Sequence, residues 1–587
     1  PGYMSPEQAA GEDNIGPASD QYSLALVLYE MLGGSPAYVG MLRSVLARQI
    51  TEPPPPIVAL RPDISAMLVS TLDRALAKPP ENRWPSTASF GEALRASSGG
   101  TTPAAPAPES SDARLSLAIL PFANIGGDSA NDFFSDGITE ELIGSISRLP
   151  RLRVVSRTSA FSFRNTDVAL PEIGARLRVG YVLTGSVRRA GDRLRLSAQL
   201  SRVADDTLLW SERYERKVAD VFDVQDDLCR RITATVREAL GSIGTATPAH
   251  VHHAQSVTAY DQYLLGRYAW NKRTAEGLKE GLACFQRAID ADPAYAPAYA
   301  GLADSHALLA SNNVVPPHVA YPAARAAALR AIDLDPLLAE GYASLGLVRL
   351  NYDWDWEGAE REFRTAIELN PSYSTAWQWY SSFLSSMGRH DEAITSAQQA
   401  TALDPLSILA TIRLGIAYSY ALNYEQALAT LERATAMDPT FLNSQSWLSN
   451  AYQGLGRYED ALRVAEDAYT ASQNSPAWRG LLAIVYRGMG RDDEARAIFQ
   501  DRVRASDIPP FFMAFLYLML DDHDQVYAWL NRGVDERSDQ MHSLRTNPRF
   551  ITAWSDPRFA AVLQRMRLGP PQHLPNSSAD SAKNDKR

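Results

Sequence analysis

The sequence predicts a multidomain protein of α and α/β class, with a helical N-terminal part, an α/β sandwich and a C-terminal α-solenoid. Three observations predict this organisation. The chain has 587 residues, enough for three or more domains. Residues 181–189 and 193–202 alternate apolar and polar side chains around Ala-Gly-Asp, as the strands of a β-hairpin do. Asp-Pro or Asn-Pro pairs then recur about every 34 residues, which indicates a helical repeat array.

Composition restricts the classes of partner. A hydrophobic content of 45% and a charged content of 21% are typical of a globular protein. The net charge of −11 offers no basic surface, so we expect no nucleic-acid partner. No apolar run reaches the ~20 residues that a membrane-spanning helix needs, so we expect no membrane segment. Cys229 and Cys284 lie far apart and suit a reducing compartment, which predicts a cytoplasmic location.

Three segments of the first hundred residues are similar to parts of one enzyme family. Residues 20–32 are apolar on nearly all sides and precede Gly33-Gly34, as in a buried helix with a glycine stop. Residues 1–7 read Pro-Gly-Tyr-Met-Ser-Pro-Glu, and residues 75–84 read Ala-Leu-Ala-Lys-Pro-Pro-Glu-Asn-Arg-Trp. Together they resemble the end of the activation segment, the central helix and a late segment of the C-lobe of bacterial serine/threonine protein kinases. The resemblance covers residues 1–95, and Ala25 stands where the family has glycine.

The resemblance implies a role for several residues. Glu7 would form a buried ion pair with Arg83, and Asp20 would accept hydrogen bonds from the backbone of the catalytic loop. Three further residues would shape the substrate-side pocket: Gly2, Tyr3 and Met4.

Phosphoryl transfer needs residues that this sequence does not contain. A kinase uses a glycine-rich loop, a lysine, a catalytic-loop aspartate and asparagine, and a metal-binding aspartate. All of them precede the activation segment in the family, so we expect no catalytic residue here, and we expect ATP and Mg²⁺ to bind only the full-length parent. Because residue 1 is proline, we interpret the chain as an incomplete sequence of a kinase. A genuine start at Met4, which would yield a relic, is the alternative.

Residues 96–113 are small, polar and rich in proline, which predicts a flexible linker. Residues 114–242 then combine short apolar strands with two helices, one beginning at Asp136 as its N-cap and one at 221–240. Residues 157–161, 181–189 and 209–214 of this α/β segment resemble the TolB-like N-terminal domain of bacterial signalling proteins. That resemblance implies no chemistry.

Two weaker signals are interpreted as structural. Residues 134–139 are faintly similar to the metal-aspartate segment of class III nucleotide cyclases, but a second aspartate-bearing hairpin is missing. His250, His252 and His253 have no cysteine or acidic ligands at metal spacing, so we expect no metal site.

The C-terminal half resembles the tetratricopeptide repeat, a pair of helices of about 34 residues. The prolines of the Asx-Pro pairs are spaced by 43, 35, 34 and 34 residues, and an alanine lies five residues before each. We expect about seven to eight helix pairs over residues 255–540, closing helices over 541–568 and a disordered tail over 569–587. We also expect residues 255–560 to fold independently.

The function of such an array is binding of a protein or peptide along its inner helices. Four polar residues are candidates for this groove: Gln378, Ser382, Asn450 and Gln453. We therefore expect a fragment of a kinase that phosphorylates protein serine or threonine, with modules for protein–protein interaction. The alternative is a non-catalytic repeat scaffold that carries a kinase relic.

Overall fold

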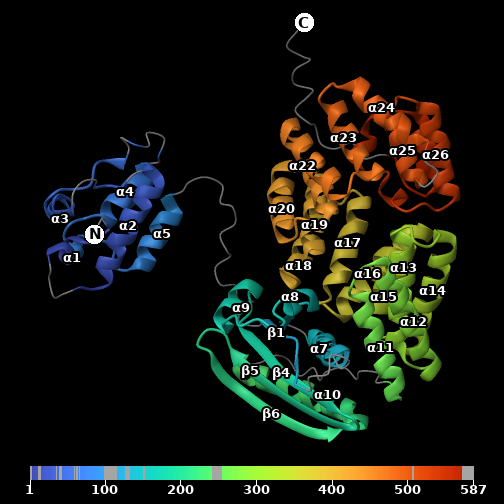
Figure 1. Cartoon of the computed structure of the whole chain (residues 1–587), viewed down its shortest axis with the longest axis horizontal. Coiled ribbons are helices and arrows are strands. Elements are labelled where there is room, and N and C mark those ends of the chain that lie inside the picture. The colour runs from blue at the N-terminus through green and yellow to red at the C-terminus, as the bar shows by residue number, and fades with distance from the viewer. Residues whose placement is uncertain are drawn as a thin grey trace. The chain divides into compact units, whose positions relative to one another are not determined.

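The computed structural model describes residues 3–570, except 11–14, 35, 39–41, 58, 59, 61–63, 65, 98–115, 126–131, 150, 151, 241–253, 255 and 505–507. The chain splits into two compact units, residues 1–110 and 111–587 (Figure 1). Most of the predicted linker, the histidine cluster and nearly all of the predicted tail lie outside the described residues.

The first unit is helical and is organised around α2 (Pro17–Gly33). Its other helices are α1 (Pro6–Ala10), α3 (Leu42–Thr51), α4 (Ala66–Ala75), the 3-10 turn η2 (Pro80–Asn82) and α5 (Thr87–Ser97). Tyr22 and Leu26 of α2 pack in a core with Leu72 and Phe90. Gly34 ends α2 with φ 72°, a left-handed conformation that glycine adopts without strain.

One face of α2 is open to solvent, although the sequence predicts a helix buried nearly all round. Leu24 is 51% exposed, Val27 41% and Met31 77%. These residues follow one another at helical spacing, so they form a single apolar stripe. Asp20 continues the same stripe and is also exposed.

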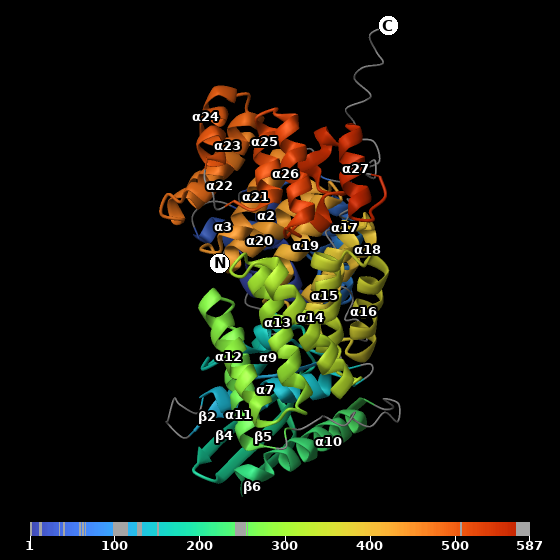
Figure 2. The same cartoon turned by 90° about the vertical axis from the view of Figure 1, so that its right-hand side faces the viewer.

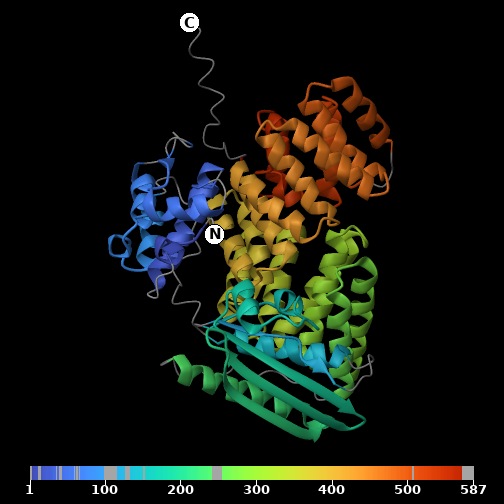
Figure 3. The same cartoon turned by 60° about the vertical axis from the view of Figure 1, so that its left-hand side comes forward.

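The second unit begins with a mixed sheet. Its strands are β1 (Ser116–Ile119), β2 (Ala123–Asn124), β3 (Arg153–Val154), β4 (Tyr181–Ala190), β5 (Arg193–Arg202) and β6 (Thr207–Lys217). The strand order is β3-β1-β4-β5-β6, and β2 pairs with β4 beyond the end of β1. The pairs among β1, β2, β3 and β4 are parallel, whereas β4, β5 and β6 are antiparallel. The predicted hairpin around residues 190–192 is therefore present, and its three long strands are visible in Figure 3.

Helices cover both faces of this sheet. The helices α7 (Asp132–Ser147) and α10 (Val221–Leu240) share an apolar core with Leu117 and Ile119 of β1. On the other face, α9 (Leu170–Leu177) packs on Ala118 and Val182, and the short α8 (Arg157–Phe161) follows β3. Figure 2 shows α10 running along the sheet.

Asp136 does not cap a helix, contrary to the sequence interpretation. The helix begins at Asp132, one turn earlier, so Asp136 lies inside α7. Its carboxylate is 3% exposed and is bonded by Arg164, and Arg157 lies 3.9 Å away. These arginines lie more than twenty residues beyond Asp136 in the sequence, so its local sequence carries no sign of them.

Eight successive helix pairs follow within the described residues. Their bounds are α11 (Val257–Trp270), α12 (Ala275–Ala291), α13 (Ala296–Ser311), α14 (Pro317–Leu334), α15 (Ala339–Val348), α16 (Trp356–Leu369), α17 (Ser374–Ser386), α18 (His390–Leu403), α19 (Ile408–Tyr420), α20 (Tyr424–Met437), α21 (Leu442–Gly454), α22 (Tyr458–Ala471), α23 (Pro476–Gly488), α24 (Asp492–Val503), α25 (Pro510–Met519) and α26 (His523–Asp535). A π-helical turn, η5 (Arg349–Asp353), extends α15. The alanines that precede the Asx-Pro pairs are fully buried: Ala288, Ala331, Ala366, Ala400 and Ala434.

The C-terminal residues close the array. They form the 3-10 turns η6 (Met541–Ser543) and η7 (Pro548–Ala553) and the helix α27 (Pro557–Arg565), where the sequence predicts closing helices. Trp354, which follows η5, shares a core with Phe550 and Phe559 of this segment. The Trp356 Nε1 donates a hydrogen bond to the Met566 carbonyl at 3.1 Å. The described C-terminal segment, residues 541–568, therefore folds back to the middle of the array.

The sheet and the first repeats share one core. Phe134, Ile138 and Leu142 of α7 belong to the same apolar cluster as Tyr260 and Leu264 of α11. A Cβ atom at Gly137 would lie 2.4 Å from the Leu264 Cδ2, so the glycine permits this close approach. In Figure 1, α7 lies between the sheet and the repeat helices. This shared core was not expected from the sequence, which suggested an independent array.

We predict that the repeats are less stable without the sheet. A fragment of residues 254–570 should remain helical by circular dichroism but melt at a lower temperature than residues 111–570, because the apolar surface of α11 becomes exposed. It should also bind the dye ANS. Equal melting temperatures for the two fragments would contradict a shared core.

Candidate functional site

A buried ion pair joins the two ends of the first unit. Arg83 Nη1 lies 2.7 Å from Glu7 Oε1 and Nη2 lies 2.9 Å from Oε2, and the two side chains are 0% and 5% exposed. The other N–H groups of Arg83 donate to three carbonyls at 2.8 Å, those of Ala18, Ala77 and Lys78. Burial alone would raise the pKa of Glu7, but hydrogen bonds from Arg83 and Ser19 outweigh it and lower the pKa to about 2.

The other residues implied by the kinase resemblance are not gathered with this pair. Tyr3 and Met4 are 43% and 40% exposed, and the Tyr3 hydroxyl donates to Glu30. Gly2 lies outside the described residues. Asp20 is exposed on α2. The structure therefore brings Glu7 and Arg83 together and leaves Tyr3, Met4 and Asp20 at the surface.

A second polar centre of this unit was missed in the sequence. Lys78 donates to the hydroxyls of Tyr22 at 2.9 Å and Tyr38 at 3.0 Å, and to the Gln49 carbonyl. Burial, followed by the nearby Arg83 charge, lowers the pKa of Lys78 to about 8. In the sequence, Lys78 is a single lysine after the short apolar run 75–77. Lysines in that position are too common to predict a buried polar centre.

The inner face of the repeats is formed by the first helix of each pair. These helices, from α11 to α23, contact one another in succession along the array. The sequence-predicted groove residues lie on two of them, Gln378 and Ser382 on α17 and Asn450 and Gln453 on α21. All four are partly exposed. The amide of Gln378 donates to Ser374 Oγ at 3.1 Å, and that of Gln453 donates to the Ser449 carbonyl at 3.2 Å.

The C-terminal segment covers α17 near these candidates. His542 of η6 hydrogen-bonds Ser386 at 2.8 Å, and Ser386 Oγ donates to the Ser382 carbonyl. Burial, aided by the charge of Arg413, lowers the pKa of His542 to about 3, so the imidazole is neutral. This part of the inner face therefore packs against the chain's own C-terminal segment.

Two arginines near this contact have no carboxylate partner among the described residues. Arg413 lies on α19. Arg549 of η7 stacks on Trp447, 5.3 Å from the ring centre. Burial lowers the pKa of both guanidinium groups, and the electrostatic effect of the nearby Tyr420 raises it in part. Neither arginine stands out in the sequence, because Arg413 is a single cation in an apolar helix and Arg549 belongs to an Asn-Pro-Arg-Phe motif that indicates a closing segment.

The α/β segment docks on the turns between repeats. In four Asx-Pro turns, the Asx side chain accepts the backbone N–H two residues later. In the turn at Asp404, that N–H, from Leu406, donates instead to Ser159 Oγ at 2.8 Å. The carboxylate of Asp404 accepts from the Ser159 backbone N–H at 2.9 Å and from its hydroxyl at 2.5 Å. Burial raises the pKa of Asp404 to about 6 despite these hydrogen bonds.

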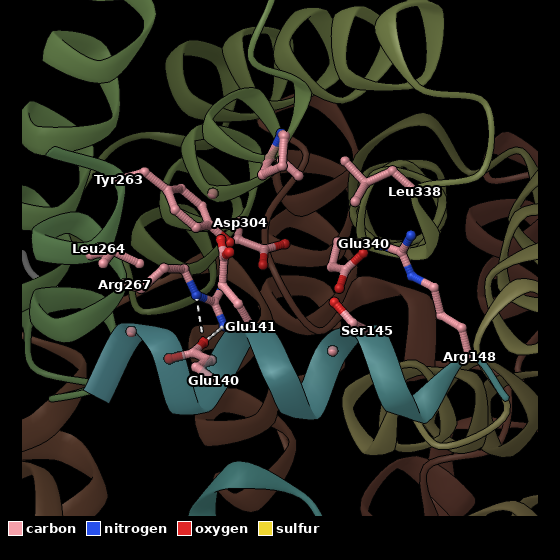
Figure 4. Close-up of a pocket in the computed structure, with 15 residues that line it drawn as sticks. Glu140, Glu141, Ser145, Arg148, Tyr263, Leu264, Arg267, Asp304, Leu338 and Glu340 are labelled. Atoms are coloured by element: carbon pink, nitrogen blue, oxygen red, sulfur yellow. Dashed lines mark hydrogen bonds and ion pairs between the residues drawn. The ribbon is translucent and has the colours of Figure 1, made fainter. Parts of the chain in front are cut away.

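A cavity of about 90 Å³, lined by charged and apolar side chains, lies where α7 faces α11, α13 and α15 (Figure 4). At one side, Glu140 accepts hydrogen bonds from Arg267 at 2.7 Å and Asn271 at 3.2 Å, and Arg157 lies 3.0 Å away. Burial raises the pKa of the neighbouring Glu141 to about 7, against hydrogen bonds from Tyr260 and Tyr295. The cavity is thus lined by charges contributed from both the α/β segment and the repeats.

Neither a metal centre nor a membrane span is found in the part of the chain that the structure describes. No group of three histidine, cysteine or acidic residues there could hold a metal ion. No described helix is long and apolar enough to cross a bilayer. Cys229 and Cys284 are buried and are not joined in a disulfide, and burial raises the pKa of the Cys229 thiol to about 12.

Family models match the second unit in parts. Residues 113–231 match the second domain of HilA/YgeH-like transcriptional regulators. Residues 355–408 and 412–476 match one tetratricopeptide-repeat model, and residues 452–506 match another. The chain therefore contains tetratricopeptide repeats.

Individual proteins resemble parts of the chain. A putative adenylate cyclase 3 of Rhizobium meliloti is 35% identical over 199 residues, which are 34% of this chain and 34% of that protein. The serine/threonine-protein kinase PknB of Mycobacterium tuberculosis is 36% identical over 151 residues, which are 25% of this chain and 24% of the kinase. The matched residues thus span about a third of the cyclase and about a quarter of the kinase. The chain is homologous to bacterial serine/threonine kinases over part of its length.

A solved tetratricopeptide repeat protein from Parabacteroides merdae is 12% identical and covers 45% of this chain and 99% of its own, with a TM-score of 0.33. This likeness carries no argument about function.

We predict that Arg83→Ala destabilises the first unit by about 3–5 kcal/mol, because it leaves Glu7 as a buried charge without a cation. Hydrogen exchange of residues 17–33, measured by mass spectrometry, should accelerate strongly. The matched control is Arg74→Ala, which removes an exposed guanidinium stacked on Trp84 at 4.1 Å and should change little. Similar exchange in both variants would show that the ion pair is not structurally important.

We also predict that Asp404→Ala costs about 1–3 kcal/mol, because the buried Ser159 N–H and hydroxyl lose their acceptor. The matched control is Asp438→Ala, one repeat later, whose carboxylate accepts from Thr440 within its own turn. Urea unfolding of the second unit should show the larger loss for Asp404→Ala. Equal losses would mean that the docking contact adds no stability.

Proposed function

We propose that the chain is part of a bacterial serine/threonine protein kinase, in which residues 1–95 belong to the C-lobe of the catalytic domain. The parent would transfer the γ-phosphate of ATP, with Mg²⁺, to a protein hydroxyl. The TolB-like resemblance and the repeats suggest that the second unit binds partner proteins in bacterial signalling. Two buried cysteines outside any disulfide are consistent with a cytoplasmic location.

The buried pair of Glu7 and Arg83 is the observation that carries this proposal. Arg83 donates two hydrogen bonds to the Glu7 carboxylate and three to backbone carbonyls. Burial of these two charges is costly unless they are paired in this way. It fits the kinase resemblance, in which the glutamate of the activation segment meets this arginine. The partial identity to a kinase of Mycobacterium tuberculosis supports the same assignment.

The exposed stripe on α2 fits the same proposal. A kinase C-lobe surrounds its central helix with the segments that carry the catalytic loop, and Leu24, Val27 and Met31 are the surface those segments would cover. Asp20 on that stripe would then accept hydrogen bonds from the catalytic-loop backbone. Gly2, Tyr3 and Met4 would border the substrate.

The second candidate is a scaffold whose only activity is protein binding. The tetratricopeptide repeats at residues 355–408, 412–476 and 452–506 favour it, since such repeats bind proteins without a catalytic residue of their own. The partner would be a protein or peptide on the inner face of the repeats, near Asn450 and Gln453 of α21. The cations of Arg413 and Arg549 favour a partner that carries acidic side chains.

The gene upstream of the Pro1 codon distinguishes the two candidates. For a kinase, we expect an open frame that encodes a glycine-rich loop, its lysine and a His-Arg-Asp-type loop. The full-length protein should then phosphorylate a generic substrate such as myelin basic protein, and replacement of the catalytic-loop aspartate should abolish the transfer. A frame without these motifs, or a full-length protein without phosphoryl transfer, would refute the kinase and leave the scaffold.

A further inference from the structure

The cavity between α7 and the repeats contains polar groups that no described residue satisfies. Asp304 of α13 is 1% exposed, and its Oδ1 accepts a hydrogen bond from Ser344, whereas its Oδ2 has no partner among the described residues. Within the same part of the chain, the buried Oε2 of Glu340 and the buried Nη1 of Arg148 also have no hydrogen-bond partner. A buried polar atom of this kind costs about 1–3 kcal/mol, so three around one cavity suggest a ligand.

These groups face one another across the cavity. Figure 4 shows Asp304 and Glu340 projecting from the repeat helices toward α7, with Arg148 and Ser145 projecting from the other side beside Glu340. The remaining charged groups of the lining are already satisfied. Glu140 is paired with Arg267, and Glu141 is hydrogen-bonded by Tyr295.

The unsatisfied atoms define the chemistry of a ligand. Two carboxylate oxygens require a donor with several N–H groups, and a primary ammonium provides three. The free N–H group of Arg148 requires an acceptor, and a carboxylate is the acceptor with which arginine bonds most strongly. One small molecule with both groups would satisfy all three atoms.

The size of the cavity restricts that molecule. One water molecule needs about 10–15 Å³ of cavity volume. A cavity of about 90 Å³ therefore holds several waters or one small organic molecule. Pockets for drug-sized ligands are several times larger, about 300–1,000 Å³. Leu264 and Leu338 add apolar contacts for a short aliphatic group.

We infer that this cavity binds a small zwitterion, a free amino acid with a short side chain, with its ammonium group at Asp304 and Glu340 and its carboxylate at Arg148. The ligand would bridge α7 and the inner repeat helices, so binding would strengthen their association. The second unit would then sense a metabolite as well as bind proteins. This inference does not rest on the kinase proposal, because every residue involved lies in the second unit.

Isothermal titration of the full chain with glycine and with L-alanine tests the inference. We expect binding of one molecule per chain and a rise in the melting temperature of the second unit, since a ligand that binds only the folded state stabilises it. Ethylammonium, which lacks the carboxylate, and acetate, which lacks the ammonium, should each bind at least about tenfold more weakly.

Two variants localise the site. Asp304→Asn keeps an acceptor for Ser344 but removes the charge, and Arg148→Gln changes a residue just beyond the end of α7, where folding is little affected. Each should weaken binding about tenfold or more. The matched control is Asp290→Asn, an exposed carboxylate of α12 outside the cavity, which should bind as the unchanged chain does.

Three outcomes would overturn the inference. The first is that neither glycine nor L-alanine binds. The second is that both Asp304→Asn and Arg148→Gln bind the amino acid as tightly as the unchanged chain does. The third is that ethylammonium binds as tightly as the amino acids. The last would assign the cavity to a simple cation instead. Because the Arg148→Gln variant leaves the core intact, a folding defect in Asp304→Asn would not prevent a decision.

Discussion

The burial of α7 on two sides is the constraint on which the second unit depends. This helix packs its apolar residues on the sheet and, through Phe134 and Ile138, against α11. A helix covered in this way has little solvent to hydrate its charges, so the repeats must supply their counter-charges. Arg267 does so for Glu140, whereas the neutral hydroxyls of Tyr260 and Tyr295 supply Glu141 with hydrogen bonds and no charge. The two modules are therefore complementary in charge as well as in shape.

The same constraint changes the repeats. Each Asx-Pro turn normally satisfies its own backbone, and the turns at Asp292, Asp335, Asn370 and Asp438 do this. In the turn at Asp404, the Leu406 N–H donates to the Ser159 hydroxyl, and the Asp404 carboxylate accepts a hydrogen bond from the Ser159 N–H. Asp404, an aspartate like those of other repeat turns, thus serves as an interface residue as well as a turn residue.

The elements that sequence predicts well are those with local signals. The hairpin alternation, the glycine after α2 and the buried alanines of the repeats depend only on neighbours within about five residues. The contact of Asp136 with Arg164, the contact of Ser159 with Asp404 and the cavity at Asp304 join residues 28 to 245 positions apart. No local spacing in the sequence indicates which of these residues meet. Glu7 and Arg83, 76 residues apart, could be paired only through the resemblance to a family.

Occupation of the inner face by the chain itself limits where a partner can bind. The helices α11 to α15 face α7, and α17 contacts His542 of the C-terminal segment. A peptide that displaced either segment would expose its apolar core, and displacement of α7 would also break the bond of Glu140 to Arg267, at a cost of several kcal/mol. The C-terminal segment also reaches α21, through the stacking of Arg549 on Trp447. Of the groove residues inferred from the sequence, Gln378 and Ser382 lie on the helix that His542 contacts, and Asn450 and Gln453 lie on the helix that Arg549 contacts. A protein partner would therefore have to fit beside this segment at either pair.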